Sequence, residues 1–273
     1  WTAPTTGLNN GVLGSSTIKY TIVRLPDNVT VASNYTSTTF TDNNIPAIGV
    51  YAYKVVANNA QGEGGSAISN TEMLGPAITP PYSMGFEEDE QYTLWTVVDA
   101  NNDNRTWTRE ANTGGIPGHA MRNKYSSSVA ADDWLITPKI TLEGGVNYNI
   151  SFKARKNSAT YTETFKVFLG NGLNPEDFTT EVFNVENSEQ EVTTEYQEYF
   201  ISANVETTGE YYIAILATSN KNQYYLYIDD FEIFKSSAHD LKALALKGPK
   251  WGVLHKELEL KVDLQNLCAT TAS

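Results

Sequence analysis

Cysteine is nearly absent from this sequence. Cys268 is the only cysteine among the 273 residues, so no disulfide can form within the chain. Histidine is also scarce, and His119, His239 and His255 lie far apart. A zinc site requires several nitrogen or sulfur ligands at short spacing. The sequence therefore offers neither a disulfide framework nor a recognisable zinc centre.

Long apolar runs and positive charge are lacking as well. No stretch of about 20 apolar residues occurs, so no segment is suited to crossing a membrane. The 19 lysines and arginines are outnumbered by 32 aspartates and glutamates, which gives a net charge of −13. Such a chain repels nucleic acid phosphates and anionic lipids, and it attracts divalent cations. We expect no nucleic acid partner and no membrane insertion.

Motifs that would carry catalysis are also missing. There is no Gly-X-Ser-X-Gly nucleophile elbow and no phosphate-binding loop. Two carboxylates such as Glu87 and Asp230 could in principle form a glycosidase pair. In a chain that attracts cations, they are better suited to a role as ligands. We therefore expect a protein that is not an enzyme.

Strand-forming residues are abundant, above all Thr, Val, Ile and 16 tyrosines. Residues 17–24 and 50–57 alternate apolar and polar side chains with a period of two. Turn-forming residues separate these segments, at 26–28, 42–44 and 62–65. The pattern predicts a β-sandwich over residues 1–76.

Several segments of residues 1–76 carry a family resemblance. They are Trp1-Thr-Ala-Pro4, Tyr20-Thr-Ile-Val-Arg24, Thr39-Phe-Thr-Asp42, the run from Tyr51 to Gly64, and Ser69-Asn70. They resemble a truncated fibronectin type III domain that lacks its first strand and most of its second. One sheet would then leave apolar surface open, and Tyr51 and Tyr53 fall on the strand that carries the family's tyrosine corner. Residues 77–81 are proline-rich and are expected to form a stiff linker.

Residues 82–237 form the largest predicted unit. Its apolar and aromatic stretches lie at 94–98, 133–138, 146–154, 164–169, 196–201, 210–216 and 224–233. Their regular spacing, with no long helix between them, predicts two packed antiparallel sheets. The expected fold class is all-β: an Ig-like (fibronectin type III) β-sandwich followed by a larger antiparallel jelly-roll sandwich.

The segment from Asp99 to Trp107 is rich in hard oxygen ligands. Asp99, Asn101 and Asp103 alternate, which places three oxygen-bearing side chains on one side of a tight loop. Calcium takes about 6–8 such oxygens. The spacing resembles the start of an EF-hand loop, but Asn104 stands where that loop needs Gly and no amphipathic helix flanks it. We therefore expect a calcium loop in a β protein; the alternative is a solvated turn.

Four further carboxylates are candidate calcium ligands. They are Glu87, Asp133, Asp229 and Asp230. The first and last strands of a jelly roll are commonly neighbours, so Glu87 can meet the Asp229-Asp230 pair. Successive strand residues point to opposite faces, so we expect Asp229 to share a face with Tyr227, and Asp230 with Ile228 and Glu232. The alternative is that the pair caps a strand end in water.

Four motifs in residues 82–237 carry a second resemblance. They are Phe86-Glu87, the acidic loop ending at Trp107, Asp133-Trp-Leu-Ile-Thr-Pro138 and Tyr227-Ile-Asp-Asp-Phe231. Together they resemble the cleaved-adhesin, or choice-of-anchor J, domain of gingipain-type haemagglutinins, with MAM domains as distant relatives. The resemblance implies a calcium-binding jelly roll that serves adhesion in modular surface proteins of Bacteroidota type. The loop departs from the family's pattern at Asn102, where Gly is frequent.

Residues 238–273 carry a third resemblance. The segments 238–244 and 258–267, in which Leu258, Leu260, Val262 and Leu264 alternate, resemble the opening strands of a bacterial cell-adhesion-related Ig-like domain. A lone strand cannot bury its apolar face. We expect this N-terminal fragment of a domain to pack on the jelly roll or to be poorly ordered.

Aromatic side chains are the remaining candidates for binding. Trp95, Trp107, Trp134 and many tyrosines could stack on sugar rings, although Trp107 and Trp134 are expected to pack inside the protein. The tyrosines Tyr224, Tyr225 and Tyr227 are a candidate contact surface.

The sequence predicts a non-catalytic adhesin-like module, secreted or on the cell surface, with a calcium-stabilised jelly roll. Its partner would be a host extracellular protein or glycan. The sequence begins at Trp1 and looks like an excised fragment, so the absence of a signal peptide says little, and we expect a parent multi-domain chain. The alternative is a carbohydrate-binding module accessory to a larger secreted glycosidase or protease, and a third option is a structural spacer.

Overall fold

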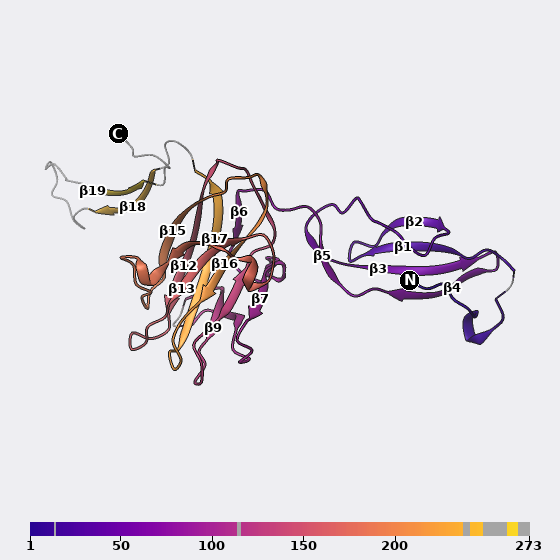
Figure 1. The fold of residues 1–273 in the computed structure, drawn as a ribbon, viewed down its shortest axis with the longest axis horizontal. Coiled ribbons are helices and arrows are strands. Elements are labelled where there is room, and N and C mark those ends of the chain that lie inside the picture. Colours follow the sequence, from indigo (N-terminus) through magenta and orange to yellow (C-terminus); the bar gives the residue numbers. More distant parts are fainter. Residues whose placement is uncertain (14, 114–115, 237–240, 248–260, 267–273) are drawn as a thin grey trace, which may run out of the picture. The chain divides into compact units, whose positions relative to one another are not determined.

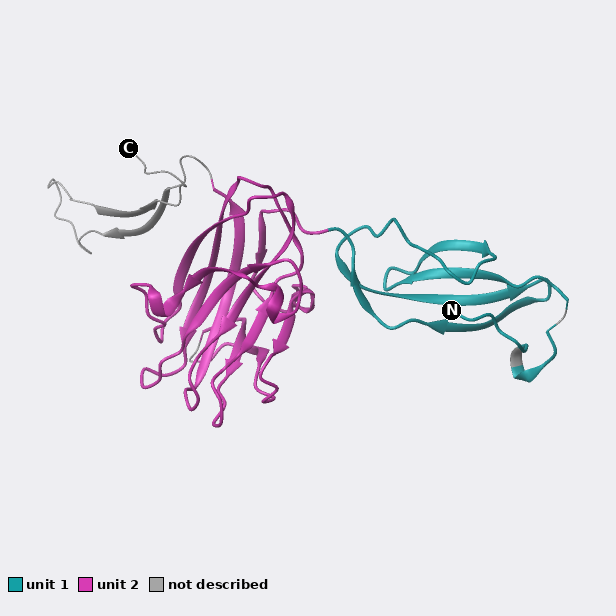
Figure 2. Ribbon diagram, viewed as in Figure 1, with its two compact units in different colours: residues 1–76 teal, residues 77–273 magenta. Residues whose placement is uncertain are grey.

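The chain forms two compact units, residues 1–76 and 77–273 (Figure 2). The computed structural model describes residues 1–13, 15–113, 116–236, 241–247 and 261–266. Helix in these ranges is limited to short 3-10 turns: η1 (Leu8–Asn10), η2 (Tyr92–Leu94), η3 (Pro175–Asp177) and η4 (Val185–Asn187). None of the helices described is long and apolar enough to cross a bilayer. The all-β class predicted from the sequence is confirmed.

The N-terminal unit is built on antiparallel strands (Figure 1). They are β1 (Lys19–Leu25), β2 (Val29–Tyr35), β3 (Gly49–Asn59), β4 (Gly62–Ile68) and β5 (Glu72–Leu74). Their order is β2-β1-β3-β4, and β5 pairs with the start of β3. The alternation predicted for residues 17–24 is present, since Tyr20, Ile22 and Arg24 are buried along β1.

Apolar surface stays open on this unit. Ile68 is 61% exposed and Trp1 is 40% exposed. A hollow of about 590 Å³ is lined by these two residues together with Ile22, Phe40 and Leu74, among others. The buried face of the β1–β3 sheet is therefore covered incompletely by the described residues.

The larger unit is a sandwich of two antiparallel sheets (Figure 1). One has the order β14-β13-β16-β10-β7, with β11 paired to β16, and the other has the order β15-β12-β17-β9-β8, with β6 paired to β17. The strands are β6 (Tyr82–Met84), β7 (Thr96–Asp99), β8 (Trp107–Ala111), β9 (His119–Lys124), β10 (Asp133–Ile136), β11 (Ile140–Leu142), β12 (Asn147–Lys156), β13 (Phe165–Gly170), β14 (Thr180–Asn184), β15 (Gln197–Asn204), β16 (Gly209–Ala217) and β17 (Tyr225–Lys235). This is the predicted jelly-roll-like sandwich.

The main core lies between these two sheets. Phe152, Phe165 and Tyr199 come from different strands, are fully buried, and place their ring centroids 5.0–5.8 Å apart. A smaller apolar cluster is built around Trp134, whose ring stacks on Phe178 at 5.2 Å. The neighbour of Trp134, Leu135, belongs to the main core, so the two side chains leave β10 on opposite faces.

Residues 77–81, expected to be a linker, take part in the larger unit. Ile78 forms a parallel bridge with Ile140. Its amide donates to the Lys139 carbonyl at 2.8 Å, and its carbonyl accepts from the Thr141 amide at 2.7 Å. This segment is therefore tied to the edge of the sandwich by backbone hydrogen bonds.

At the C-terminal end, β18 (Leu241–Lys247) and β19 (Lys261–Asn266) form an antiparallel pair. β19 lies inside the strand predicted over residues 258–267. The predictions that involve His239, His255, Leu258, Leu260 and Cys268 fall outside the described residues.

Candidate metal centre

The acidic loop leaves β7 at Asp99 and folds around that carboxylate. The Asp103 amide donates to Asp99 Oδ1 at 3.3 Å and to Asn101 Oδ1 at 3.1 Å, and the Asn104 amide donates to Asp99 Oδ2 at 2.9 Å. Asn102 and Asn104 have φ values of 57° and 61°. Asparagine tolerates this left-handed conformation better than most residues. The Asx-rich sequence therefore curls into a tight loop that gathers its oxygens.

Asp133 lies beside this loop because β10 and β7 are paired. Its Cα is the register partner of the Asp99 Cα. The Trp107 indole N–H donates to the Asp133 carbonyl at 2.9 Å, which ties the end of the loop to β10. The Asp133 side chain is only 1% exposed, and its Oδ2 accepts from Asn123 Nδ2 at 2.9 Å. The fold thus buries one carboxylate among two others.

The charge of Asp133 is disfavoured in this place. Burial raises the pKa of Asp133 to about 7, and the negative charges of Asp99 and Asp103 act in the same direction. The hydrogen bond from Asn123 favours the charged form, but it does not offset the burial. Without a cation, the Asp133 carboxyl therefore stays protonated at pH values well above those at which an aspartate normally ionises.

Several oxygens around the loop are buried without a partner. In the described residues, the buried side-chain oxygens that make no hydrogen bond are Asp103 Oδ2, Thr106 Oγ1, Asp133 Oδ1 and Gln197 Oε1. The first three belong to the loop and to Asp133. Burying a polar atom without a partner is costly. A hard cation is the ligand that would satisfy such a set, because calcium binds carboxylate, hydroxyl and carbonyl oxygens.

Glu87 and Asp229 form a second acidic site. Asp229 is 8% exposed and accepts from the Asp230 amide at 2.8 Å and from Asn112 Nδ2 at 3.4 Å. Burial raises its pKa to about 6, with further contributions from the charges of Asp230 and Glu87. Glu87 also accepts from the His119 amide at 3.3 Å. The pairing of β6 with β17 brings the start and end of the unit together here.

Gly118 allows the Glu87 carboxylate to approach the backbone. A Cβ on Gly118 would lie 2.2 Å from Glu87 Oε1, and its φ is +84°. The His119 imidazole lies on the same side, with Nδ1 3.6 Å from Glu87 Oε2. Glu87 is therefore held between a glycine and a histidine.

Asp230 is adjacent to this site, but its side chain is engaged by a lysine outside it. It is exposed, has a φ of 47°, and pairs with Lys153 at 2.6 Å. The register between β12 and β17 shifts at this point. The prediction that Asp230 and Glu232 share a face with Ile228 is wrong, because Ile228 and Phe231 both enter the core while Asp230 and Glu232 are exposed. The register shift interrupts the alternation of side chains along β17, so Asp230 does not point to the face that strict alternation predicts.

The structure gathers the predicted ligands into two groups. Asp99, Asp103 and Asp133 meet at the loop, with Asn101 in its scaffold, and Glu87 meets Asp229 elsewhere. Among the described residues, no cluster of three or more acidic, histidine or cysteine side chains is arranged to hold a metal as it stands. A cation at the loop would therefore draw on amide, hydroxyl or backbone oxygens as well.

Sequence reasoning did not find all the residues of these sites. Thr106, Asn123 and Asn112 lie beside the predicted carboxylates. Thr106 could have been suspected, since it continues the acidic loop. Asn112 and Asp229 are 117 residues apart, and nothing in the sequence links them.

The tryptophans that the structure describes in the larger unit are too buried to bind sugars. Trp95, Trp107 and Trp134 are 6%, 3% and 6% exposed. The idea that these rings stack on sugars is wrong, and the expectation that Trp107 and Trp134 pack inside is confirmed.

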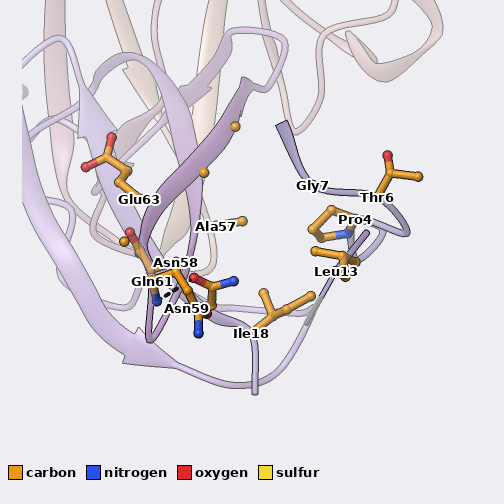
Figure 3. Close-up of a pocket in the computed structure, with 13 residues that line it drawn as sticks. Pro4, Thr6, Gly7, Leu13, Ile18, Ala57, Asn58, Asn59, Gln61 and Glu63 are labelled. Atoms are coloured by element: carbon orange, nitrogen blue, oxygen red, sulfur yellow. Dashed lines mark hydrogen bonds between the residues drawn. The ribbon is translucent and has the colours of Figure 1, made fainter. Parts of the chain in front are cut away.

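The N-terminal unit carries a hollow of about 200 Å³ next to the β3–β4 turn (Figure 3). Its described lining includes Pro4, Leu13, Ile18 and Asn58, and Glu63 is its one charged member. None of the predicted site residues lies here.

The fold defines the class of the larger unit as an all-β, jelly-roll-like sandwich. The family model of the Cleaved Adhesin Domain matches residues 81–239, more than half of the chain. The chain therefore belongs to the cleaved adhesin domain family.

The chain is similar to several solved structures, among them two cleaved adhesin domains. The K1 cleaved adhesin domain of Lys-gingipain from Porphyromonas gingivalis is 18% identical with a TM-score of 0.46, covering 57% of this chain and 98% of that one. The K3 domain of the same protein is 19% identical with a TM-score of 0.45, covering 56% and 96%. The xylan-binding domain of Paenibacillus barcinonensis Xyn10C is 12% identical with a TM-score of 0.40, covering 59% and 97%. No curated protein matches the chain.

Proposed function

We propose that this chain is a non-catalytic adhesion module whose jelly roll is stabilised by calcium, and that it acts outside the cell or at its surface. Its partner is a host extracellular protein or glycan. The observation that carries the calcium part is the group of buried, unpartnered oxygens Asp103 Oδ2, Thr106 Oγ1 and Asp133 Oδ1. Membership of the cleaved adhesin family supports the adhesive part.

Asp99, Asn101, Asp103 and Asp133 would hold the ion at the loop, with Thr106 close by. A bound calcium would offset the repulsion among the three carboxylates and keep Asp133 ionised. Calcium would also tie β7 to β10, because Asp99 is the last residue of β7 and Asp133 is the first residue of β10. Glu87 and Asp229 are a second candidate pair of ligands, while Asp230 is engaged by Lys153.

The N-terminal unit would serve as a fibronectin type III-like spacer. Tyr51 supports this, because its hydroxyl donates to the Ala47 carbonyl, four residues upstream, at 2.9 Å. A tyrosine that bonds back to the preceding corner is typical of Ig-like sandwiches. The paired strands β18 and β19 would begin a further Ig-like domain.

Calorimetric titration of the whole chain with calcium tests the ion site. We expect saturable binding that Asp103→Asn weakens strongly. Asp132→Asn is the matched control, because Asp132 precedes Asp133 and its Oδ1 accepts from the Trp134 indole instead. Absence of binding, or equal loss in both variants, would count against the loop as the site. Solid-phase binding to host extracellular matrix proteins tests adhesion separately.

A further inference from the structure

Four tyrosines pack ring against ring at one end of the jelly roll. Tyr224 lies 4.2 Å from Tyr225 and 5.9 Å from both Tyr125 and Tyr161, measured between ring centroids. None belongs to either buried apolar cluster. Tyr161 is 36% exposed, and the other three are partly exposed. We call this set the tyrosine platform.

The backbone holds the platform in place. The Tyr125 amide donates to the Tyr224 carbonyl at 3.0 Å, and the Asn157 amide donates to the Tyr225 carbonyl at 3.1 Å. The Tyr224 amide donates to Glu163 Oε1 at 2.7 Å, and Glu163 is 4% exposed. Three separate chain segments are therefore fixed before any ligand arrives, which lowers the entropic cost of binding.

Polar groups border the rings. The Arg122 guanidinium lies 4.8 Å above the Tyr225 ring, and its Nη2 donates to Glu110 Oε1 at 2.9 Å. Arg122 Nε is buried and makes no hydrogen bond within the described part of the chain. Lys124 is the register partner of Tyr225. The partly exposed, mutually tilted rings thus stand beside hydrogen-bonding groups that could orient a ligand.

The size of the platform and the net charge of the chain limit the classes of ligand that could bind. An aromatic side chain offers about 150–250 Å² of surface, so four partly exposed rings present at most about 300 Å². A stable protein interface takes about 800 Å² from each partner. The net charge of −13 also opposes anionic ligands such as nucleic acids. A ligand with flat apolar faces and hydroxyl edges, a few rings long and uncharged, fits best.

We infer that the tyrosine platform binds a neutral polysaccharide, with sugar rings stacked on Tyr161 and Tyr224, Tyr225 supporting the Tyr224 ring, and hydroxyls bonded by Arg122 and Glu110. This rests on the proposed function and deepens it, because it names the class of glycan and the surface that binds it; it needs no ion at the acidic sites, so calcium titration and glycan binding can fail independently. It also differs from the earlier expectation, because Tyr227 is fully buried and takes no part. The binding surface lies instead on Tyr125, Tyr161, Tyr224 and Tyr225.

Affinity electrophoresis of the whole chain, with calcium present, tests this inference. The gels contain a neutral β-glucan, a mannan, a galactan or, as an anionic probe, chondroitin sulfate. We expect at least one neutral polymer to slow the chain, and Tyr161→Ala to weaken that binding about tenfold, the scale of losing one stacking ring. Tyr161→Phe, which keeps the ring, should bind nearly as well.

Two controls separate binding from folding. Tyr35→Ala removes a surface tyrosine of the N-terminal unit that also contacts other rings, and it should leave the binding unchanged. Tyr225→Ala should weaken binding further; should it fail to fold, the comparison of Tyr161→Ala with Tyr161→Phe decides. No slowing by any neutral polymer, slowing by chondroitin sulfate alone, or unchanged binding in Tyr161→Ala would each overturn the inference.

Discussion

Replacing Asp133 with asparagine should have opposite effects with and without calcium. In the absence of the ion, the 1% exposed carboxylate is disfavoured by burial and by Asp99 and Asp103. Asparagine removes the charge and keeps an oxygen that can accept from Asn123. With calcium present, the same change removes a charged ligand. The variant should therefore be more stable than the native chain in chelator and gain less stability from calcium.

The size of this effect follows from the pKa. Asp133 titrates at about 7 in the folded chain, against an ordinary value of 3.8. The folded state therefore holds its proton more tightly than the unfolded state. The loss of folding stability caused by ionising Asp133 is absent below about pH 4, grows as the pH rises, and is complete above about pH 7. A shift of about three units corresponds to at most about 4 kcal/mol, and relaxation of the site reduces this to about 2 kcal/mol.

Thermal unfolding at pH 8 is the assay. A gain of about 2 kcal/mol raises the Tm of a unit of this size by about 4–8 °C, so we expect that rise for Asp133→Asn in EGTA. In saturating calcium the order should reverse. An equal loss of stability in EGTA and in calcium would refute the reasoning, because it would make Asp133 an ordinary buried hydrogen-bonding group.

Three further outcomes are expected. In EGTA, the Tm of the native larger unit should fall as the pH rises from about 5 to 8, since the pKa values of Asp133 and Asp229 are raised to about 7 and 6; a flat profile would contradict those values. Trp134→Ala should cost about 3–5 kcal/mol in denaturant unfolding, because the ring is buried against Phe178, and a cost below about 1 kcal/mol would place it on the surface. Gly118→Ala should destabilise the larger unit by more than about 1 kcal/mol in calorimetry, because alanine is strained at a φ of +84° and its Cβ would clash with the Glu87 carboxylate. Unchanged stability would contradict this prediction.

Local patterns in the sequence predicted most of the fold. The alternation of residues 17–24 became β1, and the apolar run after Asp133 became β10 with Trp134 buried. These features depend on neighbouring residues, so period and turn chemistry are sufficient to find them. The same holds for the loop at Asp99, whose Asx residues bond the adjacent backbone.

Features that depend on distant segments were not predictable. Asp230 takes a φ of 47° where β17 shifts register against β12, and its side chain is exposed and paired with Lys153 while that of Asp229 is buried. Tyr227 is covered completely, while Tyr161 comes from a distant loop to complete the tyrosine platform. Such contacts arise from how the sheets and loops pack, and alternation along one strand does not reveal them.

Scanning calorimetry of the whole chain in calcium and in EGTA tests the central claim most directly. Calcium at about 100 times its dissociation constant adds about 2.7 kcal/mol to the stability of the unit that binds it. We predict that the transition of the larger unit rises by roughly 5–10 °C, while that of residues 1–76 stays where it is. Identical transitions in calcium and EGTA would contradict a calcium-stabilised jelly roll.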